Sequence, residues 1–200
     1  MDHNRAQFNE VRLGDYTSVG LTADASRTIP NTYKPLLLTP STYWIFALDE
    51  HDKGISEHWY NASWRAVGNW SRVGTLQGWG SATAFRQWSA SHPKQAYTGA
   101  GWFRHTFTGQ DLEESQLPSS IALAISAACG SLNGWINGFP INMPSSSVSP
   151  EAPLLLQLPR KAVKLSGPNV LALRFQDQDG TTCKPPQGAG LRGRVYVVGK

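Results

Sequence analysis

Short segments rich in aromatic and β-branched residues recur along this chain, and Gly, Pro, Asn and Ser separate them. In "GWFRHTFTG" (101–109), Phe103, His105 and Phe107 alternate with polar or differently sized neighbours, the period-two pattern of a half-buried strand. "GWINGFPI" (134–141) predicts two short strands joined by a tight Asn-Gly turn. Further strands are expected in residues 42–50, 120–128, 153–159, 168–177 and 192–199. The spacing of these segments, without a convincing long helix, predicts an all-β antiparallel sandwich.

The chain length of 200 residues fits one domain of this class. Residues 1–40 are rich in Thr, Pro and Asn with weak periodicity, and we expect an irregular N-terminal lead-in there. The β-sandwich domain is then expected over residues 41–200. Within it, residues 49–101 form a long, turn-rich stretch, and such stretches in compact domains usually contain functional loops.

Composition excludes several classes of function. The net charge is +4, but the basic residues are scattered rather than gathered in the dense stripe of a nucleic-acid-binding module. No apolar run approaches the length of a membrane span, about 20 residues. The first ten residues, "MDHNRAQFNE", lack the apolar region of a signal peptide. We therefore expect no nucleic-acid partner, no membrane span and no leader in this chain.

Motifs for catalysis or for an organic cofactor are missing as well. The sequence contains no nucleophile elbow, phosphate loop, dinucleotide fingerprint or histidine spacing for zinc. The four acidic residues between Asp49 and Glu57 cluster in sequence without indicating a pair of carboxylates across a cleft. Two cysteines, Cys129 and Cys183, are too few for a disulfide framework, and both a single bridge and a buried thiol remain open.

Five segments in one order carry a family resemblance: "YWIFALDEHDKGISEHWYNASW", "YTGAGWFRHTF", "GWINGFPI", "GPNVLALRF" and "GAGLRGRVYV". This series resembles the sugar-binding jelly-roll domain of glycoside hydrolase family two, within the galactose-binding-like superfamily. The similarity covers roughly residues 42–199. It departs from the family pattern at Phe103, where the family usually has Tyr, and in the Trp-rich stretch between Trp70 and Tyr97.

The resemblance implies a non-catalytic carbohydrate-binding module, accessory to a glycoside hydrolase, because the catalytic carboxylates of that family lie in a separate barrel domain. The implied partners are a glycan and a catalytic hydrolase domain. The implied location is extracellular or periplasmic. Many related modules hold a structural calcium with loop oxygens, for which Asp177 and Asp179 are the candidates here.

Tryptophan is the side chain most suited to bind a sugar, because its ring packs against the C–H face of a pyranose. Seven of the eight tryptophans lie between Trp44 and Trp102. Four of them fall on structural positions of the family, and we expect these to pack in the core: Trp44, Trp59, Trp64 and Trp102. Trp70, Trp79 and Trp88 lie outside the pattern, in Gly- and Ser-rich surroundings typical of binding loops.

Two further residues complete the candidate sugar site. Arg104 could donate to sugar hydroxyls, although an internal ion pair with Asp49 or Asp52 is the stronger expectation. Trp135 could contact a ligand at the rim of the site or pack half-buried on its strand. The triplets that begin at Asn61 and Asn69 fit the glycosylation pattern, whose use depends on a secretory route.

Two other functions remain open from the sequence. The domain could brace a larger, β-galactosidase-like hydrolase without any sugar affinity of its own. It could also bind a protein, because exposed Trp and Arg side chains are enriched in protein interfaces as well.

Overall fold

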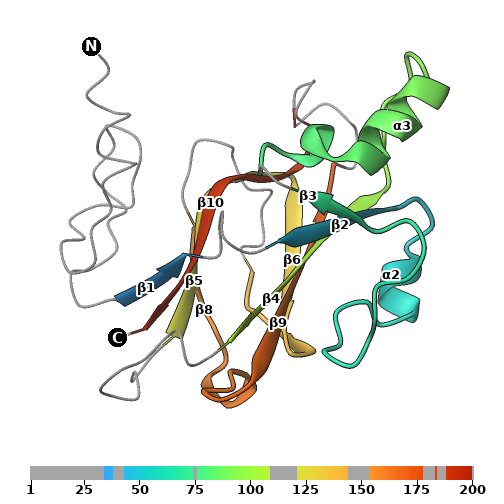
Figure 1. Ribbon diagram of the computed structural model, residues 1–200. Helices are drawn as coiled ribbons and strands as arrows, with labels where there is room; N and C mark the ends of the chain where they lie inside the picture. The colour runs from blue at the N-terminus through green and yellow to red at the C-terminus, as the bar shows by residue number, and fades with distance from the viewer. Residues whose placement is uncertain are drawn as a thin grey trace, which may run out of the picture.

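The computed structural model describes residues 43–73, 76–108, 121–143, 154–177, 183 and 188–199, together with the backbone of 34–37. Two antiparallel sheets form a sandwich, which confirms the predicted fold class (Figure 1). The four-stranded sheet has the order β1 (Lys34–Leu37), β10 (Gly190–Gly199), β5 (Ile121–Cys129) and β8 (Leu154–Gln157). The six-stranded sheet has the order β3 (Ser71–Val73), β2 (Trp44–Asp49), β4 (Ala100–Thr108), β9 (Pro168–Gln176), β6 (Ser131–Ile136) and β7 (Phe139–Pro140).

Strand β1 lies inside the segment that was expected to be an irregular lead-in. It pairs with β10, with Lys34 opposite Gly199 and Leu37 opposite Tyr196. These four residues therefore belong to the sandwich. The rest of the predicted lead-in lies outside the described residues.

The core lies between the sheets and follows the predicted alternation. In β5, Ile121, Leu123 and Ile125 point into the main core. The intervening Ala122 and Ala124 belong to a second, smaller buried cluster on the other face of the same sheet. The large and the small side chains of this strand, which alternate in the sequence, thus lie on opposite faces of the sheet.

The predicted hairpin forms between β6 and β7. Asn137 and Gly138 both have positive φ, at 53° and 88°, which is the backbone of a two-residue type I′ turn. The Asn137 amide also donates to the carbonyl oxygen of Ala162 at 2.7 Å and to Oδ1 of Asn169 at 2.8 Å, so the turn is fixed to the neighbouring loop.

Two short helices, α2 (Lys53–Ser56) and α3 (Thr83–Ser91), lie beside the six-stranded sheet near β2 and β3 (Figure 1). A turn of 3-10 helix, η1 (Trp79–Ser81), precedes α3 and is hydrogen-bonded to the start of β10. A further turn of 3-10 helix, η3, spans Arg160–Ala162. Helix α3 falls within the stretch expected to consist of loops. Its residues Ala84, Phe85 and Trp88 pack against the core, and this contact supports a helix that is only 9 residues long. No helix in the part of the chain that the structure describes is long and apolar enough to cross a bilayer.

Candidate functional site

The segment between β2 and β3, residues 50–70, covers the outer face of the six-stranded sheet. It starts at Asp49, a buried carboxylate at the end of β2. Asp49 Oδ1 accepts the backbone N–H of Lys53 at 2.7 Å, and Oδ2 accepts the N–H of Gly54 at 2.8 Å. Oδ2 also accepts the indole N–H of Trp102 at 2.9 Å. One carboxylate thus holds the start of this segment, including α2, against β4.

Arg104 holds the middle of the same segment. Its guanidinium donates to the carbonyl oxygens of Trp64 at 2.8 Å and Asn61 at 2.7 Å, and it lies 5.1 Å from the centre of the Trp64 ring. Burial lowers the pKa of Arg104 from its usual value. The expected ion pair with Asp49 or Asp52 is wrong, because the backbone carbonyls of the covering segment occupy the guanidinium. Arg104 is therefore a structural residue of the loop rather than a group that faces a ligand.

Asp52 pairs with a different arginine. Arg174 Nη2 lies 2.6 Å from Asp52 Oδ1, and Nε of the same arginine donates to that oxygen at 3.0 Å. Arg174 extends from β9, so this bond fastens the covering segment to a second strand.

Three tryptophans of the covering segment form a compact cluster. The ring centroids of Trp59, Trp64 and Trp70 lie 5.2 to 5.7 Å apart in each of the three pairs. Trp59 also meets the buried Trp102 edge-on at 5.9 Å. All three members of the cluster are half-buried, so each keeps part of its surface open to solvent.

Trp135 is a packing residue. Its ring stacks on those of Tyr60 and Trp102, at centroid distances of 4.9 and 5.4 Å and interplanar angles of 16° and 21°. The alternative of half-buried packing therefore describes Trp135.

Trp79, another candidate for contact with a sugar, is buried. Its side chain is 2% exposed and belongs to the main core, against Phe85 and Tyr97. The backbone N–H of Trp79 donates to the carbonyl oxygen of Ala189 at 2.7 Å, which ties η1 to the start of β10. Surroundings rich in Gly suggested an exposed loop, but the indole is buried, and Gly188 lies so close to it that a side chain at that position would collide with the ring.

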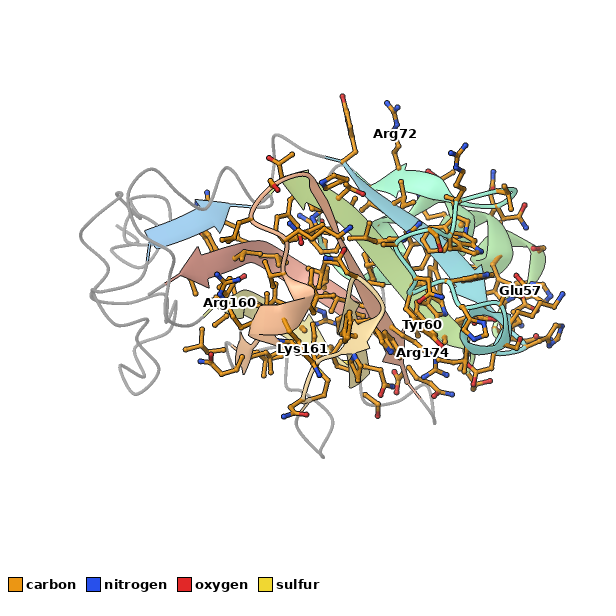
Figure 2. All side chains as sticks on the ribbon, turned by 90° about the horizontal axis from the view of Figure 1, so that it is seen from below. Glu57, Tyr60, Arg72, Arg160, Lys161 and Arg174 are labelled. Atoms are coloured by element: carbon orange, nitrogen blue, oxygen red, sulfur yellow. A yellow bond between two sulfur atoms is a disulfide. The ribbon has the colours of Figure 1, made fainter. Side chains whose placement is uncertain are left out.

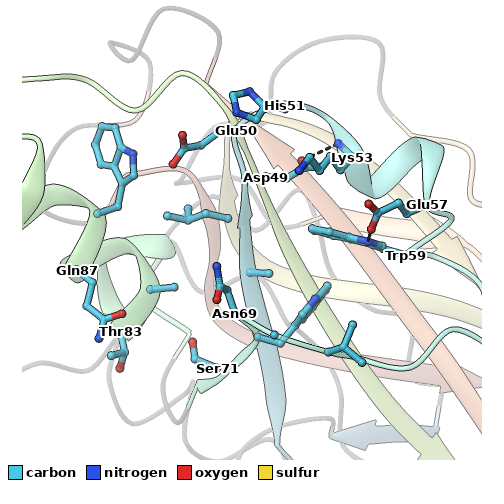
Figure 3. A pocket seen from close by; sticks show the side chains of 17 residues that line it. Asp49, Glu50, His51, Lys53, Glu57, Trp59, Asn69, Ser71, Thr83 and Gln87 are labelled. Atoms are coloured by element: carbon cyan, nitrogen blue, oxygen red, sulfur yellow. Dashed lines mark hydrogen bonds between the residues drawn. The ribbon is translucent and has the colours of Figure 1, made fainter.

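Trp70 and Trp88 are the two predicted tryptophans that line a common groove. The groove has a volume of about 820 Å³ and lies over β2, between the covering segment and α3. Figure 3 shows Glu57 and Trp59 on one side, Thr83 and Gln87 of α3 on the other, and Asn69 between them (Figure 3).

The walls of this groove combine aromatic rings with polar groups. Trp88 is half-buried, and one face of its ring stacks on His92 at 4.6 Å and 12°. Glu57 accepts the indole N–H of Trp59 at 2.8 Å, which fixes both side chains in the wall. The hydroxyl of Ser71 is buried beside the groove and has no hydrogen-bond partner within the described part of the chain. Such a wall offers ring faces for a C–H surface and several donors and acceptors for hydroxyl groups.

Sequence reasoning missed the polar half of this groove. Nine polar residues line it that were not among the predicted sugar contacts: Asp49, Glu50, His51, Lys53, Glu57, Asn69, Ser71, Thr83 and Gln87. Asn69 was considered only as a glycosylation position, and it is exposed in the groove, whereas Asn61 is half-buried beside Gly138. The acidic run 49–57 was a visible signal, but nothing in the sequence places α3 opposite to it.

The expected calcium ligands are only partly described. Asp177 is 3% exposed, and its Oδ2 accepts the backbone N–H of Cys183 at 3.0 Å. Its Oδ1 is buried without a hydrogen-bond partner, while Asp179 lies outside the described residues. Calcium needs six to eight oxygen ligands. Among the residues that the structure describes, no three His, Cys, Asp or Glu side chains come together, and the calcium site at Asp177 and Asp179 stays a prediction.

Cys129 and Cys183 form a disulfide, which resolves the alternatives left by the sequence. Both residues are buried, and the bridge joins the end of β5 to the segment between β9 and β10. Cys183 also lines a second cavity of about 600 Å³ with Trp79, Tyr97 and Asp177.

Comparison with known proteins identifies the fold. No protein-family model and no curated protein sequence matches the chain. Among solved structures, β-glucuronidase from Ruminococcus gnavus in complex with D-glucuronic acid has a TM-score of 0.57 at 16% sequence identity, over 84% of this chain and 29% of that chain. The same enzyme in complex with N1-substituted uronic isofagomine has a TM-score of 0.56 at 18% identity, over 84% of this chain and 30% of that chain.

The chain therefore spans less than a third of the length of these enzymes. At such low identity the similarity establishes a shared fold. The β-sandwich of this protein has the fold of one part of the β-glucuronidase chain.

Proposed function

We propose that this protein is a non-catalytic carbohydrate-binding domain, accessory to a glycoside hydrolase, and that it binds neutral glycans in the groove between residues 50–70 and α3. The observation that carries the proposal is the lining of that groove, where the half-buried Trp70 and Trp88 accompany the amides of Asn69 and Gln87. Its volume of about 820 Å³ is of the size that small-ligand sites have.

The chemistry of sugars fits these groups. The C–H face of a pyranose packs on an indole ring, and its hydroxyls exchange hydrogen bonds with amides, carboxylates and hydroxyls. The exposed side chains of Asn69, Gln87 and Glu50 line the groove and are groups that a bound hydroxyl can reach. Contacts of this kind hold a glycan without any bond being broken.

The fold supports a context within a larger hydrolase. The similarity to β-glucuronidase extends over only 30% of that chain, which fits a domain that accompanies a separate catalytic module. The disulfide between Cys129 and Cys183 supports an extracellular or periplasmic location, because such bonds persist in oxidising compartments.

The test is affinity electrophoresis of the 200-residue chain in gels that contain galactan, mannan, arabinan or glucan. We expect retention by at least one polysaccharide, and two- to tenfold weaker binding in Trp70→Ala and in Trp88→Ala, about the range expected from lost ring stacking. Phe139→Ala is the matched control, because Phe139 is an aromatic side chain 42% exposed on β7, outside the groove.

Retention that both tryptophan variants leave unchanged would move the site away from this groove. No retention on any polysaccharide would contradict glycan binding. The observation that the chain matches less than a third of a hydrolase would then favour the second candidate, a domain that braces a catalytic module.

A further inference from the structure

The groove carries most of the acidic side chains in the described part of the chain. Five carboxylate residues are described, and four of them lie within residues 49–57. Three of these four line the groove, namely Asp49, Glu50 and Glu57, and they are opposed there by the ammonium of Lys53.

The carboxylates differ in what they already bind. Both oxygens of Asp49 accept hydrogen bonds from the covering segment and from Trp102, so this residue is committed to the fold. Glu57 uses Oε2 for the indole N–H of Trp59 and keeps Oε1 for another donor. Glu50 is exposed, and no described residue donates a hydrogen bond to its side chain. Glu50 and Glu57 are therefore the two carboxylates that a ligand in the groove can meet.

This local charge is opposite in sign to that of the whole chain, which has a net charge of +4. Exposed basic side chains such as Arg160, Lys161 and Arg72 lie well apart from Glu57 (Figure 2). At physiological salt, charges interact over about 8 Å, so a ligand in the groove responds mainly to the carboxylates of the groove and to two nearby cations. These are Lys53 in the lining and Arg86, which donates to the lining Thr83 at 3.3 Å.

Resting on the proposed binding of neutral glycans, we infer that the groove binds glycans with protonated amino groups, such as oligomers of glucosamine, more tightly than neutral ones, and glycans of uronic acids less tightly. Glu50 and Glu57 are the residues that set this preference. An ammonium group gains a charged hydrogen bond from either carboxylate, and the indole faces in the same groove also attract cations. A uronate would bring a third free negative charge next to two others and would be repelled.

The inference is tested by measuring, with calorimetry, the affinity of the 200-residue chain for three matched oligomers. These are glucosamine oligomers with protonated amines, N-acetylglucosamine oligomers and glucuronate-containing oligomers. We expect the affinity to be highest for the glucosamine oligomers, lower for the N-acetylglucosamine oligomers and lowest for the glucuronate-containing oligomers. Glu50→Gln and Glu57→Gln should each reduce the preference for the amine by about two- to fivefold, the range of one exposed ion pair.

Gln157→Lys is the matched control, because it makes the same change in net charge at an exposed position of β8, in the other sheet. It should leave the preference unchanged. Equal affinity for the amine and the acetylated oligomer, or tighter binding of the glucuronate oligomer, would overturn the inference while glycan binding itself would stand. An equal effect of Gln157→Lys and Glu50→Gln would also overturn it, since net charge alone would then act. No binding of any oligomer or polysaccharide would contradict the proposed function instead.

Discussion

The indole N–H of Trp102 donates to Oδ2 of Asp49 at 2.9 Å, and this bond joins the start of the covering segment to the middle of the six-stranded sheet. The same carboxylate accepts two backbone N–H groups of the segment, from Lys53 and Gly54. A carboxylate that is 4% exposed thus accepts hydrogen bonds from three donors at once.

Asp49→Ala should therefore be strongly destabilising. It removes three hydrogen bonds to a charged acceptor and leaves the Trp102 indole N–H buried without a partner, so we expect a loss of about 3–5 kcal/mol in the free energy of unfolding. Chemical denaturation followed by fluorescence and circular dichroism measures this loss. Asp49→Asn keeps one acceptor oxygen, so its free energy of unfolding should lie between those of the native chain and Asp49→Ala.

Asp52→Ala is the comparison for that variant. Asp52 is 58% exposed, but its partner Arg174 is only 8% exposed and would keep Gln176 as its other described acceptor, so we expect a smaller cost of about 1–3 kcal/mol. Equal costs for the two substitutions would show that the contacts of Asp49 do not anchor the segment.

The buried His105 should make stability depend on pH. Burial lowers the pKa of His105 to about 4, partly opposed by its hydrogen bond to the carbonyl oxygen of Tyr43. The unfolded chain takes up a proton near pH 6.5, whereas the folded protein does so only near pH 4. The stability that neutral His105 contributes is thus fully present above pH 6.5 and is lost as the pH falls from there to 4, by at most about 3 kcal/mol.

Denaturation midpoints between pH 7 and pH 4 test this prediction when they are compared with those of His105→Gln. The variant should be less stable at neutral pH, because it loses the stacking of His105 on Trp44, at 4.9 Å between ring centroids. Its stability should nevertheless fall less steeply with acid. Parallel pH profiles would assign the slope to other groups.

Removal of the disulfide should destabilise the fold without altering its topology. The bridge closes a separation of 54 residues, for which the loss of loop entropy in the unfolded chain predicts about 4 kcal/mol. Thermal unfolding of the double variant Cys129→Ser, Cys183→Ser should show a correspondingly lower Tm. Added reductant should lower the Tm of the native chain and leave that of the double variant unchanged. A native chain whose Tm is insensitive to reductant, with two titratable thiols, would contradict the bridge.

Much of the sandwich could be predicted because its strands obey local rules. The alternating pattern in 101–109 predicts a strand, and β4 forms there. The Asn137-Gly138 pair predicts a tight turn, and the β6–β7 hairpin forms around it. Helix α3 was missed for the opposite reason. Its sequence has no capping residue and few apolar positions, and packing of Phe85 and Trp88 on the core stabilises it.

The groove was only half predictable for a related reason. Trp70 and Trp88 could be selected by composition, but Trp79 has similar Gly-rich neighbours and is buried. The difference depends on the approach of the chain near Ala189, more than a hundred residues away. Arg104 was expected to pair with a carboxylate, but it binds backbone carbonyl oxygens. Every residue has such an oxygen, so the sequence does not show which of them an arginine binds.

The indole cluster of the covering segment also gives the protein an optical property. The ring centroid of Trp59 lies within 5.9 Å of those of Trp64, Trp70 and Trp102. At such distances, excitation energy absorbed by one indole transfers readily to the others. The emission then comes mainly from the indole whose excited state has the lowest energy. Relaxation of solvent around an indole lowers that energy. Two of the four indoles, Trp59 and Trp70, border the groove. The intrinsic fluorescence of the native chain should consequently act as a built-in reporter of what enters that groove, without any attached dye.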